Sequence, residues 1–235
     1  MQDMKIKLFC LPHAGGSSSI YYSWNKYIDK SKYELIPIEY AGHGIKLDEN
    51  LNYLFDNLVN DVYNEILHSI KKDTKYIIFG HSMGAYIAFE VERKIEKKYE
   101  KKAFHMIFSG VDAPCYWNRN KKIASLSDAE FIEQIQTFGG INDEIINSPE
   151  LMKIILPILK ADFYVIESMH EYQEGFLIST SSTIMNGKND RYKKENIEHW
   201  QCFSNKACTI KYYNGGHFFI NDNAKLICEY INSLN

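Results

Sequence analysis

A serine in a setting typical of a nucleophile stands near position 80. Residues 80–84 have the form G-x-S-x-G, the apolar residues 76–79 precede them, and a helical pattern of apolar residues follows. A sharp strand-to-helix turn here lifts the serine hydroxyl into solvent, and the glycines relieve crowding between strand and helix. The turn also aims the backbone N–H of Met83, at the helix N-terminus, toward developing negative charge. We therefore predict Ser82 as the nucleophile of an acyl transfer and the Met83 N–H as an oxyanion donor.

A serine nucleophile needs a base, and a histidine near the C-terminus suits that role. His217 stands in Gly-Gly-His-Phe-Phe, residues 215–219, after the last predicted strand. The chain order serine, acid, histidine is typical of hydrolases with this elbow. The histidines of the early loops and His81, which adjoins the serine, are expected to be ordinary surface or core residues. We therefore predict that His217 takes the proton of Ser82.

Two aspartates could orient this histidine and stabilise its imidazolium form. The acid belongs at the carboxyl end of a strand before the last one. Asp190 ends the segment 183–190, in which a glycine and a short polar turn let the chain hook the carboxylate inward. Asp112, just beyond the preceding strand, is the rival, because some hydrolases carry the acid one strand earlier. We predict Asp190 as the acid and keep Asp112 as the alternative.

A loop after the first predicted strand suits a second oxyanion donor. Residues 12–17 read Pro-His-Ala-Gly-Gly-Ser, and the paired glycines permit close backbone approach and unusual φ angles. An N–H of this loop, that of Ala14, is predicted to face the nucleophile. The alternative is an ordinary glycine turn that leads into a helix.

Short β-branched and aromatic runs are predicted as the strands that position these loops. They cover residues 5–11, 33–40, 75–80, 104–110, 182–187 and 209–213. Between them lie longer segments with helical periodicity, such as the apolar residues spaced by four from Leu54 to Ile70. Strands that alternate with helices indicate a mostly parallel, doubly wound sheet. The predicted fold class is therefore α/β, of the α/β-hydrolase type.

The interval of about residues 115–172 interrupts this alternation, because it offers helices in succession and no convincing strand. We predict that it forms an inserted helical cap, or lid. At 235 residues, with 45% hydrophobic and 24% charged residues, the chain can bury a substantial core. We predict a single domain, residues 1–235, that carries this insertion.

Helix start and stop signals divide the predicted cap. Ser127 and Glu130 form a capping box, and Gly139-Gly140 would end the helix that begins there. A second helix would begin at Ser148-Pro149, where serine can cap and proline is tolerated in the first turn. Pro157 is expected to kink or end that second helix.

Composition argues against several other classes of protein. The net charge of −3 and the pI near 6.2 give no pull toward nucleic acid. The N-terminus lacks the pattern of a signal peptide and no run reaches about 18 apolar residues, so we expect a cytoplasmic protein without a membrane segment. The five cysteines lack the C-x-x-C spacing of zinc or redox sites. We therefore expect reduced thiols, no metal and no cofactor, and we expect a monomer.

Taken together, these residues make the chain similar to the type II thioesterases of nonribosomal peptide and polyketide assembly lines. The matching positions extend over nearly the whole chain: residues 11–17, Trp24, 80–85, 89–90, 109–110, 113–114, 126–128, Phe131, 139–140, 156–157, 161–163, Gly187, Asp190, Trp200 and 215–219. The opening loop, the cap markers and the ending are together far more specific than G-x-S-x-G alone. One departure is residues 41–46, where the family often shows P-G-R followed by a further arginine.

The resemblance implies an editing enzyme. Its substrates would be acyl or aminoacyl groups stranded as thioesters on the phosphopantetheine arm of a carrier protein, and its product would be a freed carrier. The residues themselves indicate acyl transfer by a Ser-His-Asp mechanism, and the thioester preference comes from the resemblance.

Residues in and after the predicted cap could recognise substrate and partner. Aromatic residues that could line an acyl pocket are Tyr116, Trp117, Phe163 and Tyr164. Basic residues that could meet an acidic carrier protein are Arg119, Lys121, Lys122, Arg191, Lys193 and Lys194. Aromatic residues are also common in cores, and basic runs are common on solvated faces, so both alternatives stay open.

Other functions are compatible with parts of this pattern. A medium-chain fatty-acyl thioesterase or a general carboxylesterase would use the same triad. A binding module that kept the fold and lost the chemistry is a third possibility, since fold alone does not determine function. The complete set of serine, aspartate and histidine argues against the binding module.

Overall fold

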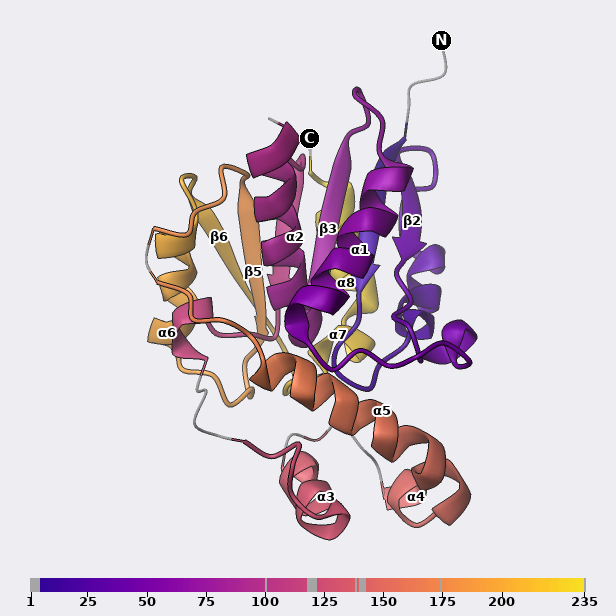
Figure 1. The fold of residues 1–235 in the computed structure, drawn as a ribbon. Helices are drawn as coiled ribbons and strands as arrows, with labels where there is room; N and C mark the ends of the chain where they lie inside the picture. The colour runs from indigo at the N-terminus through magenta and orange to yellow at the C-terminus, as the bar shows by residue number, and fades with distance from the viewer. Residues whose placement is uncertain are drawn as a thin grey trace.

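Six parallel strands form the central sheet of the computed structural model, which describes residues 5–99, 101–117, 122–137, 139, 143–173 and 175–234 (Figure 1). The strands are β1 (Ile6–Leu11), β2 (Tyr33–Pro37), β3 (Tyr76–His81), β4 (His105–Ser109), β5 (Ser182–Gly187) and β6 (Cys208–Tyr213). Their order across the sheet is β2-β1-β3-β4-β5-β6, and every neighbouring pair is parallel. The predicted α/β fold is confirmed, and each strand lies within two or three residues of its predicted bounds.

Helices cover both faces of this sheet. The helices outside the insertion are α1 (Phe55–Ser69), α2 (Met83–Tyr99), α6 (Lys194–Glu198), α7 (Phe219–Asp222) and α8 (Ala224–Asn232), with the 3-10 helices η1 (Ser18–Lys26), η2 (Gly44–Lys46) and η4 (His199–Phe203). Successive strand residues point to opposite faces. Ile78 therefore packs with residues of α1 and α2, whereas Ile77 packs with residues of η1 and α8. The apolar runs of the sequence are continuous because both faces of each central strand are buried.

The helices of the insertion follow β4 and precede β5. They are η3 (Pro114–Tyr116), α3 (Asp128–Gln136), α4 (Asp143–Ile146) and α5 (Pro149–Glu167). In Figure 1, α5 crosses the end of the sheet toward which the strands point, and α3 and α4 lie beyond it. The insertion thus lies at the carboxyl ends of the strands, where ligands bind in open parallel sheets. That it acts as a cap or lid stays a prediction.

The predicted start signals of the insertion are confirmed, and of the two outcomes predicted for Pro157 the helix end is wrong. Ser127 accepts a hydrogen bond from the Glu130 N–H, and Glu130 bonds back to Ser127, so the capping box is present. Ser148 caps α5 with Pro149 in its first turn. The helix continues through Pro157 to Glu167. Pro157 is exposed, so water can bond the carbonyl that a proline leaves without its helical donor. At the end of α3, Gly139 has a φ of +72°, while Gly140 lies outside the described residues.

Candidate active site

The turn between β3 and α2 has the geometry of a strained elbow. Ser82 has a φ of +54° and is the one non-glycine residue with positive φ in the described part of the chain. Its N–H donates to the Ser109 carbonyl at 2.7 Å, which ties the turn to β4. A residue other than glycine in this region costs about 1–3 kcal/mol. The surrounding packing holds Ser82 in this conformation, in the lining of a cavity.

The two glycines of the pentapeptide are required by close backbone contacts. A Cβ atom on Gly80 would overlap the carbonyl of Gly84, and a Cβ atom on Gly84 would overlap the carbonyls of Leu11 and Pro12. The elbow, the start of α2 and the end of β1 therefore touch through backbone atoms alone. This contact brings the loop after β1 up to the serine.

We expect Gly84→Ala to lower the free energy of unfolding by about 2–3 kcal/mol, because the added methyl group meets fixed carbonyl groups. The measurement is equilibrium denaturation in urea. Gly216→Ala is the matched control, since the nearest atom to a Cβ atom there is 3.9 Å away. Equal stabilities of the two variants would show that the elbow does not need the glycine.

Three side chains from different loops form a hydrogen-bonded chain. His217 Nε2 lies 3.1 Å from Ser82 Oγ, and His217 Nδ1 lies 3.0 Å from Asp190 Oδ2. The His217 and Asp190 side chains are 7% and 2% exposed. This is the arrangement in which a carboxylate orients an imidazole and the imidazole removes a hydroxyl proton.

A backbone contact between two loops explains why Asp190 reaches the histidine. A Cβ atom on Gly187, at the end of β5, would overlap the carbonyl of Gly216. The Asn189 N–H donates to the Gly215 carbonyl at 3.0 Å, and the Asp190 N–H turns back to the Gly187 carbonyl at 3.2 Å. The loops after β5 and β6 are therefore joined at their bases, and their side chains meet above.

Asp112, the rival acid, lies in the same cavity and makes no hydrogen bond to His217. Its Oδ2 accepts a bond from Asn196 Nδ2 at 3.3 Å, and its buried Oδ1 has no hydrogen-bond partner among the described residues. Burial, with a smaller effect of the Asp190 charge, raises the pKa of Asp112 to about 6. Asp112 is thus a poorly solvated carboxylate in the wall of the cavity.

His81 points away from the serine, as expected. It is completely buried, and its Nδ1 lies 3.0 Å from Ser109 Oγ. Burial, together with the neighbouring His217, lowers the pKa of His81 well below its ordinary value, so the ring is neutral. It therefore packs beneath the elbow as part of the core.

The two residues predicted to supply oxyanion donors, Met83 and Ala14, line the same cavity as Ser82. Met83 is the first residue of α2, so its N–H has no acceptor within the helix. In the loop after β1, the Gly15 N–H donates to Asp162 Oδ2 and the Gly16 N–H donates to the His13 carbonyl. Of these three adjacent N–H groups, that of Ala14 is the one left for a ligand in the described structure. Ala14 and Met83 both line the cavity beside Ser82.

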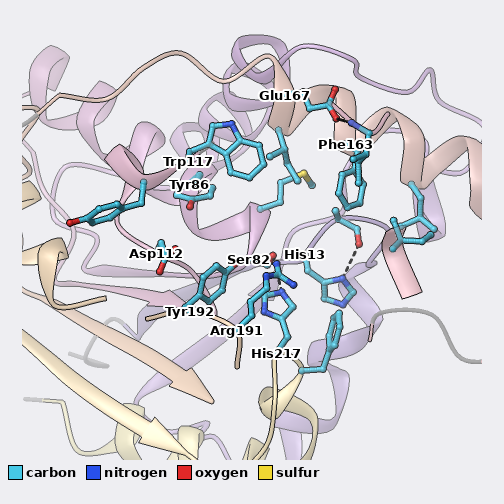
Figure 2. A pocket seen from close by; sticks show the side chains of 18 residues that line it. His13, Ser82, Tyr86, Asp112, Trp117, Phe163, Glu167, Arg191, Tyr192 and His217 are labelled. Atoms are coloured by element: carbon cyan, nitrogen blue, oxygen red, sulfur yellow. Dashed lines mark hydrogen bonds between the residues drawn. The ribbon is translucent and has the colours of Figure 1, made fainter. Parts of the chain in front are cut away.

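The cavity has a volume of about 280 Å³ and runs from Ser82 toward the insertion (Figure 2). Tyr116, Trp117 and Phe163, which the sequence offered as residues that could line an acyl pocket, line this cavity, and their binding of an acyl group stays a prediction. In Figure 2, Trp117 and Phe163 lie on the side opposite His217. Tyr164 is not part of the lining: its side chain is 38% exposed and its ring lies 6.1 Å from that of Tyr53.

Sequence reasoning missed several residues of the wall. They are Tyr86, Ile123, Ile135, Leu159, Ile166, Glu167 and Tyr192. Leu159, Phe163 and Ile166 are spaced by four and three, so they share one face of α5. That spacing could have identified the face, and it explains why Phe163 points into the cavity while Tyr164, about 100° further around the helix, does not.

The basic residues proposed for docking are only partly within the described structure. Arg119 and Lys121 lie outside the described residues. Lys122, Lys193 and Lys194 are exposed, whereas Arg191 lines the cavity with its guanidinium 4.9 Å from the Tyr192 ring. No helix in the described ranges is long and apolar enough to cross a bilayer.

Comparisons with known proteins agree with this geometry. The model of the thioesterase domain family matches residues 6–234. The gramicidin S biosynthesis protein GrsT of Aneurinibacillus migulanus is 30% identical, over 97% of this chain and 88% of GrsT. The medium-chain S-acyl fatty acid synthase thioesterase of Rattus norvegicus is 29% identical, over 97% of this chain and 88% of that protein.

A solved structure extends the similarity to three dimensions. YbtT, the type II thioesterase of the yersiniabactin NRPS/PKS pathway, is 27% identical and superposes with a TM-score of 0.85. The superposition covers 98% of this chain and 93% of YbtT. The similarity therefore includes the sheet, the elbow and the helical insertion.

Proposed function

This chain belongs to the thioesterase domain family, as a type II thioesterase of nonribosomal peptide and polyketide pathways, and from that premise we propose that it removes acyl or aminoacyl groups from the phosphopantetheine arm of carrier proteins. Ser82, His217 and Asp190 are its catalytic triad. The observation that carries the proposal is the unbroken hydrogen-bonded chain from Ser82 Oγ to Asp190, beside a cavity that Ser82, His217 and residues of the insertion line.

The proposed reaction has two halves. In the first, Ser82 Oγ attacks the thioester carbonyl while His217 Nε2 takes its proton, and the oxyanion is bound by the N–H groups of Met83 and Ala14. The C–S bond breaks, the sulfur leaves as the carrier thiol with the proton held by His217, and an ester forms on Ser82. In the second half, the neutral His217 takes a proton from water, which attacks that ester. The bond between the acyl carbon and Ser82 Oγ breaks, His217 returns the proton to Oγ, and the free acid leaves. Asp190 holds His217 in the required tautomer throughout.

A thiol is a good leaving group for this mechanism. Its ordinary pKa is about 8.5, so its departure needs less help from a proton donor than the departure of an alkoxide would. The step that most needs catalysis is therefore formation of the tetrahedral intermediate, which the oxyanion donors and the base assist.

The composition of the cavity favours acyl groups that carry a polar substituent. Apolar side chains of α5 form one wall, while Asp112 and Arg191 lie in another part of the lining. A purely aliphatic chain would leave Asp112 Oδ1 without a hydrogen-bond donor in a poorly solvated space, which is costly. An ammonium or hydroxyl group of an aminoacyl or hydroxyacyl substrate can bond Asp112 Oδ1 instead.

A medium-chain fatty-acyl thioesterase is the second candidate, because the similarity to the rat medium-chain enzyme covers nearly the whole chain. The apolar face of α5 would suit such a substrate. The two candidates can be separated by comparing the hydrolysis of one acyl group attached to a carrier protein with its hydrolysis when attached to CoA.

We expect a higher kcat/KM for an acyl group on a carrier protein than for the same acyl group on CoA. Contacts with the carrier remote from the reacting atoms provide binding energy that a small thioester lacks. Part of the gain is electrostatic, so it should fall as salt shortens the Debye length below about 10 Å. The measurement is the ratio of the two efficiencies at low and high salt.

Charge reversal tests the docking surface directly. Lys122→Glu and Lys193→Glu should lower the ratio, since both side chains are exposed and each residue adjoins one that lines the cavity, Ile123 or Tyr192. Lys225→Glu is the matched control. Lys225 is an exposed lysine of α8, which packs on the face of the sheet away from α1 and α2. Equal efficiencies on both supports, at both salt concentrations, would favour the fatty-acyl or general esterase function.

A further inference from the structure

A buried imidazole and a buried carboxylate lie behind the loop that carries Ala14. The side chains of His43 and Asp162 are each 3% exposed, and His43 Nε2 lies 2.9 Å from Asp162 Oδ2. The same carboxylate oxygen accepts a hydrogen bond from the Gly15 N–H at 2.6 Å. One oxygen atom of α5 therefore joins the turn before η2 to the loop of residues 12–17, which we call the oxyanion loop.

The partners of the imidazole require it to be charged. His43 Nδ1 lies 3.0 Å from the carbonyl oxygen of Ala41, and Nε2 faces Asp162. A carbonyl and a carboxylate only accept hydrogen bonds, so both ring nitrogens must carry a proton. Burial by itself lowers the pKa of His43, but the hydrogen bond and charge of Asp162 outweigh it, and the net effect raises the pKa.

The other groups that face His43 do not reverse this balance. Glu39, from the segment after β2, is 5% exposed and its charge also favours the imidazolium. The ring of Tyr40 lies edge-on at 5.8 Å, and burial keeps its phenol neutral by raising its pKa. His13, in the oxyanion loop, has a pKa lowered chiefly by burial, so it adds no opposing charge near neutral pH.

The oxyanion loop is pressed against α5 at the same place. Gly15 has a φ of +73°, and a Cβ atom there would overlap the side chain of Leu159. Gly15 follows Ala14 directly, so the hydrogen bond from the Gly15 N–H to Asp162 determines how the adjoining peptide of Ala14 is oriented. Loss of that bond would turn the Ala14 N–H away from Ser82, and an oxyanion donor acts only when it is aimed beforehand.

We propose that the His43–Asp162 ion pair is a positioning element for the oxyanion loop, so that thioester turnover depends on His43 carrying its proton. The inference rests on the proposed function, because it takes the Ala14 N–H as an oxyanion donor. A folded-state pKa raised above the unfolded value means that the ion pair is complete at low pH and is lost as pH rises through the raised pKa. Turnover is therefore expected to fall on the alkaline side of that pKa.

Two substitutions separate the charge of His43 from its shape. His43→Arg keeps a permanent positive charge, so this variant should keep its activity at alkaline pH. Asp162→Asn removes the charge of the pair and should lower kcat about 10- to 100-fold, less than complete loss of an oxyanion donor, with little change in KM. His68→Arg, an exposed residue of α1, is the matched control and should keep the alkaline fall of the wild type.

A spectroscopic measurement does not depend on activity. Long-range proton–nitrogen NMR of the histidine rings should show both nitrogens of His43 protonated at neutral pH, with a titration that follows the alkaline loss of kcat. A neutral His43 ring at neutral pH, or the same alkaline fall in folded His43→Arg, would overturn the inference. Should His43→Arg fail to fold, the spectrum and Asp162→Asn decide the question.

Failure of this inference can be told apart from failure of the proposed function. Wild-type protein that hydrolyses thioesters and is labelled at Ser82 by a fluorophosphonate, while Asp162→Asn keeps the wild-type kcat and pH profile, would overturn the inference alone. Wild-type protein that hydrolyses no thioester at any pH would overturn both.

Discussion

Replacing Ser82 with alanine is expected to lower thioester turnover by about four to six orders of magnitude, because the covalent route through an acyl-enzyme is lost together with the nucleophile. The cavity and the two N–H donors would remain, so substrate binding should persist. Alanine also relieves little of the strain at φ +54°, so the fold should be retained. The measurement is the single-turnover rate of thioester hydrolysis on an acylated carrier protein.

Covalent labelling identifies the reactive atom directly. A fluorophosphonate should add one label to the wild-type protein, as seen by intact-protein mass spectrometry, and none to Ser82→Ala. Ser31→Ala, an exposed serine in the loop before β2, is the control and should label like the wild type. A label that persists in Ser82→Ala would contradict the assignment of Ser82 as the nucleophile.

The second large effect is expected at the acid. Asp190→Asn should cut turnover on the order of 10⁴-fold, because an asparagine donor facing His217 Nδ1 favours the tautomer that has its proton on Nε2 and cannot accept from Ser82. Substrate binding should change little, since Asp190 lies behind the histidine rather than in the cavity lining.

Asp112→Asn is the matched control for this substitution. It changes a carboxylate of the same cavity that does not bond His217, so its effect on turnover of a simple acyl group should be mild. Melting temperatures of both variants check that the fold is intact. If Asp112→Asn were the more damaging of the two, the acid would have to be moved to the end of β4.

The elbow, the strands and the capping box could be predicted from the sequence because each depends on neighbours along the chain. Gly80 and Gly84 are needed within one strand-to-helix turn, and Ser127 bonds a residue three positions away. The apolar runs correspond to strands buried on both faces. His217 was accessible for a related reason, since the order of the functional residues follows the order of the strands.

Local sequence patterns could not exclude Asp112 as the acid, because contacts between distant parts of the chain determine which aspartate bonds His217. Asp112 and Asp190 follow the adjacent strands β4 and β5, and both end near the same cavity. The backbone contact of Gly187 with Gly216 gives Asp190 the bond to His217, and no spacing in the sequence reveals that contact. The rotation of α5 about its axis likewise separates Phe163 from Tyr164.

The pairing of His43 with Asp162 could be recognised only in the tertiary structure. His43 in an early loop has no local feature that distinguishes it from a surface histidine. Asp162 lies 119 positions further along, and only the packing of α5 on the oxyanion loop brings the two together in a space that excludes water. Sequence thus determined the types of residue available for catalysis, whereas long-range packing determined which of them meet, because burial and charge pairing depend on distance in space.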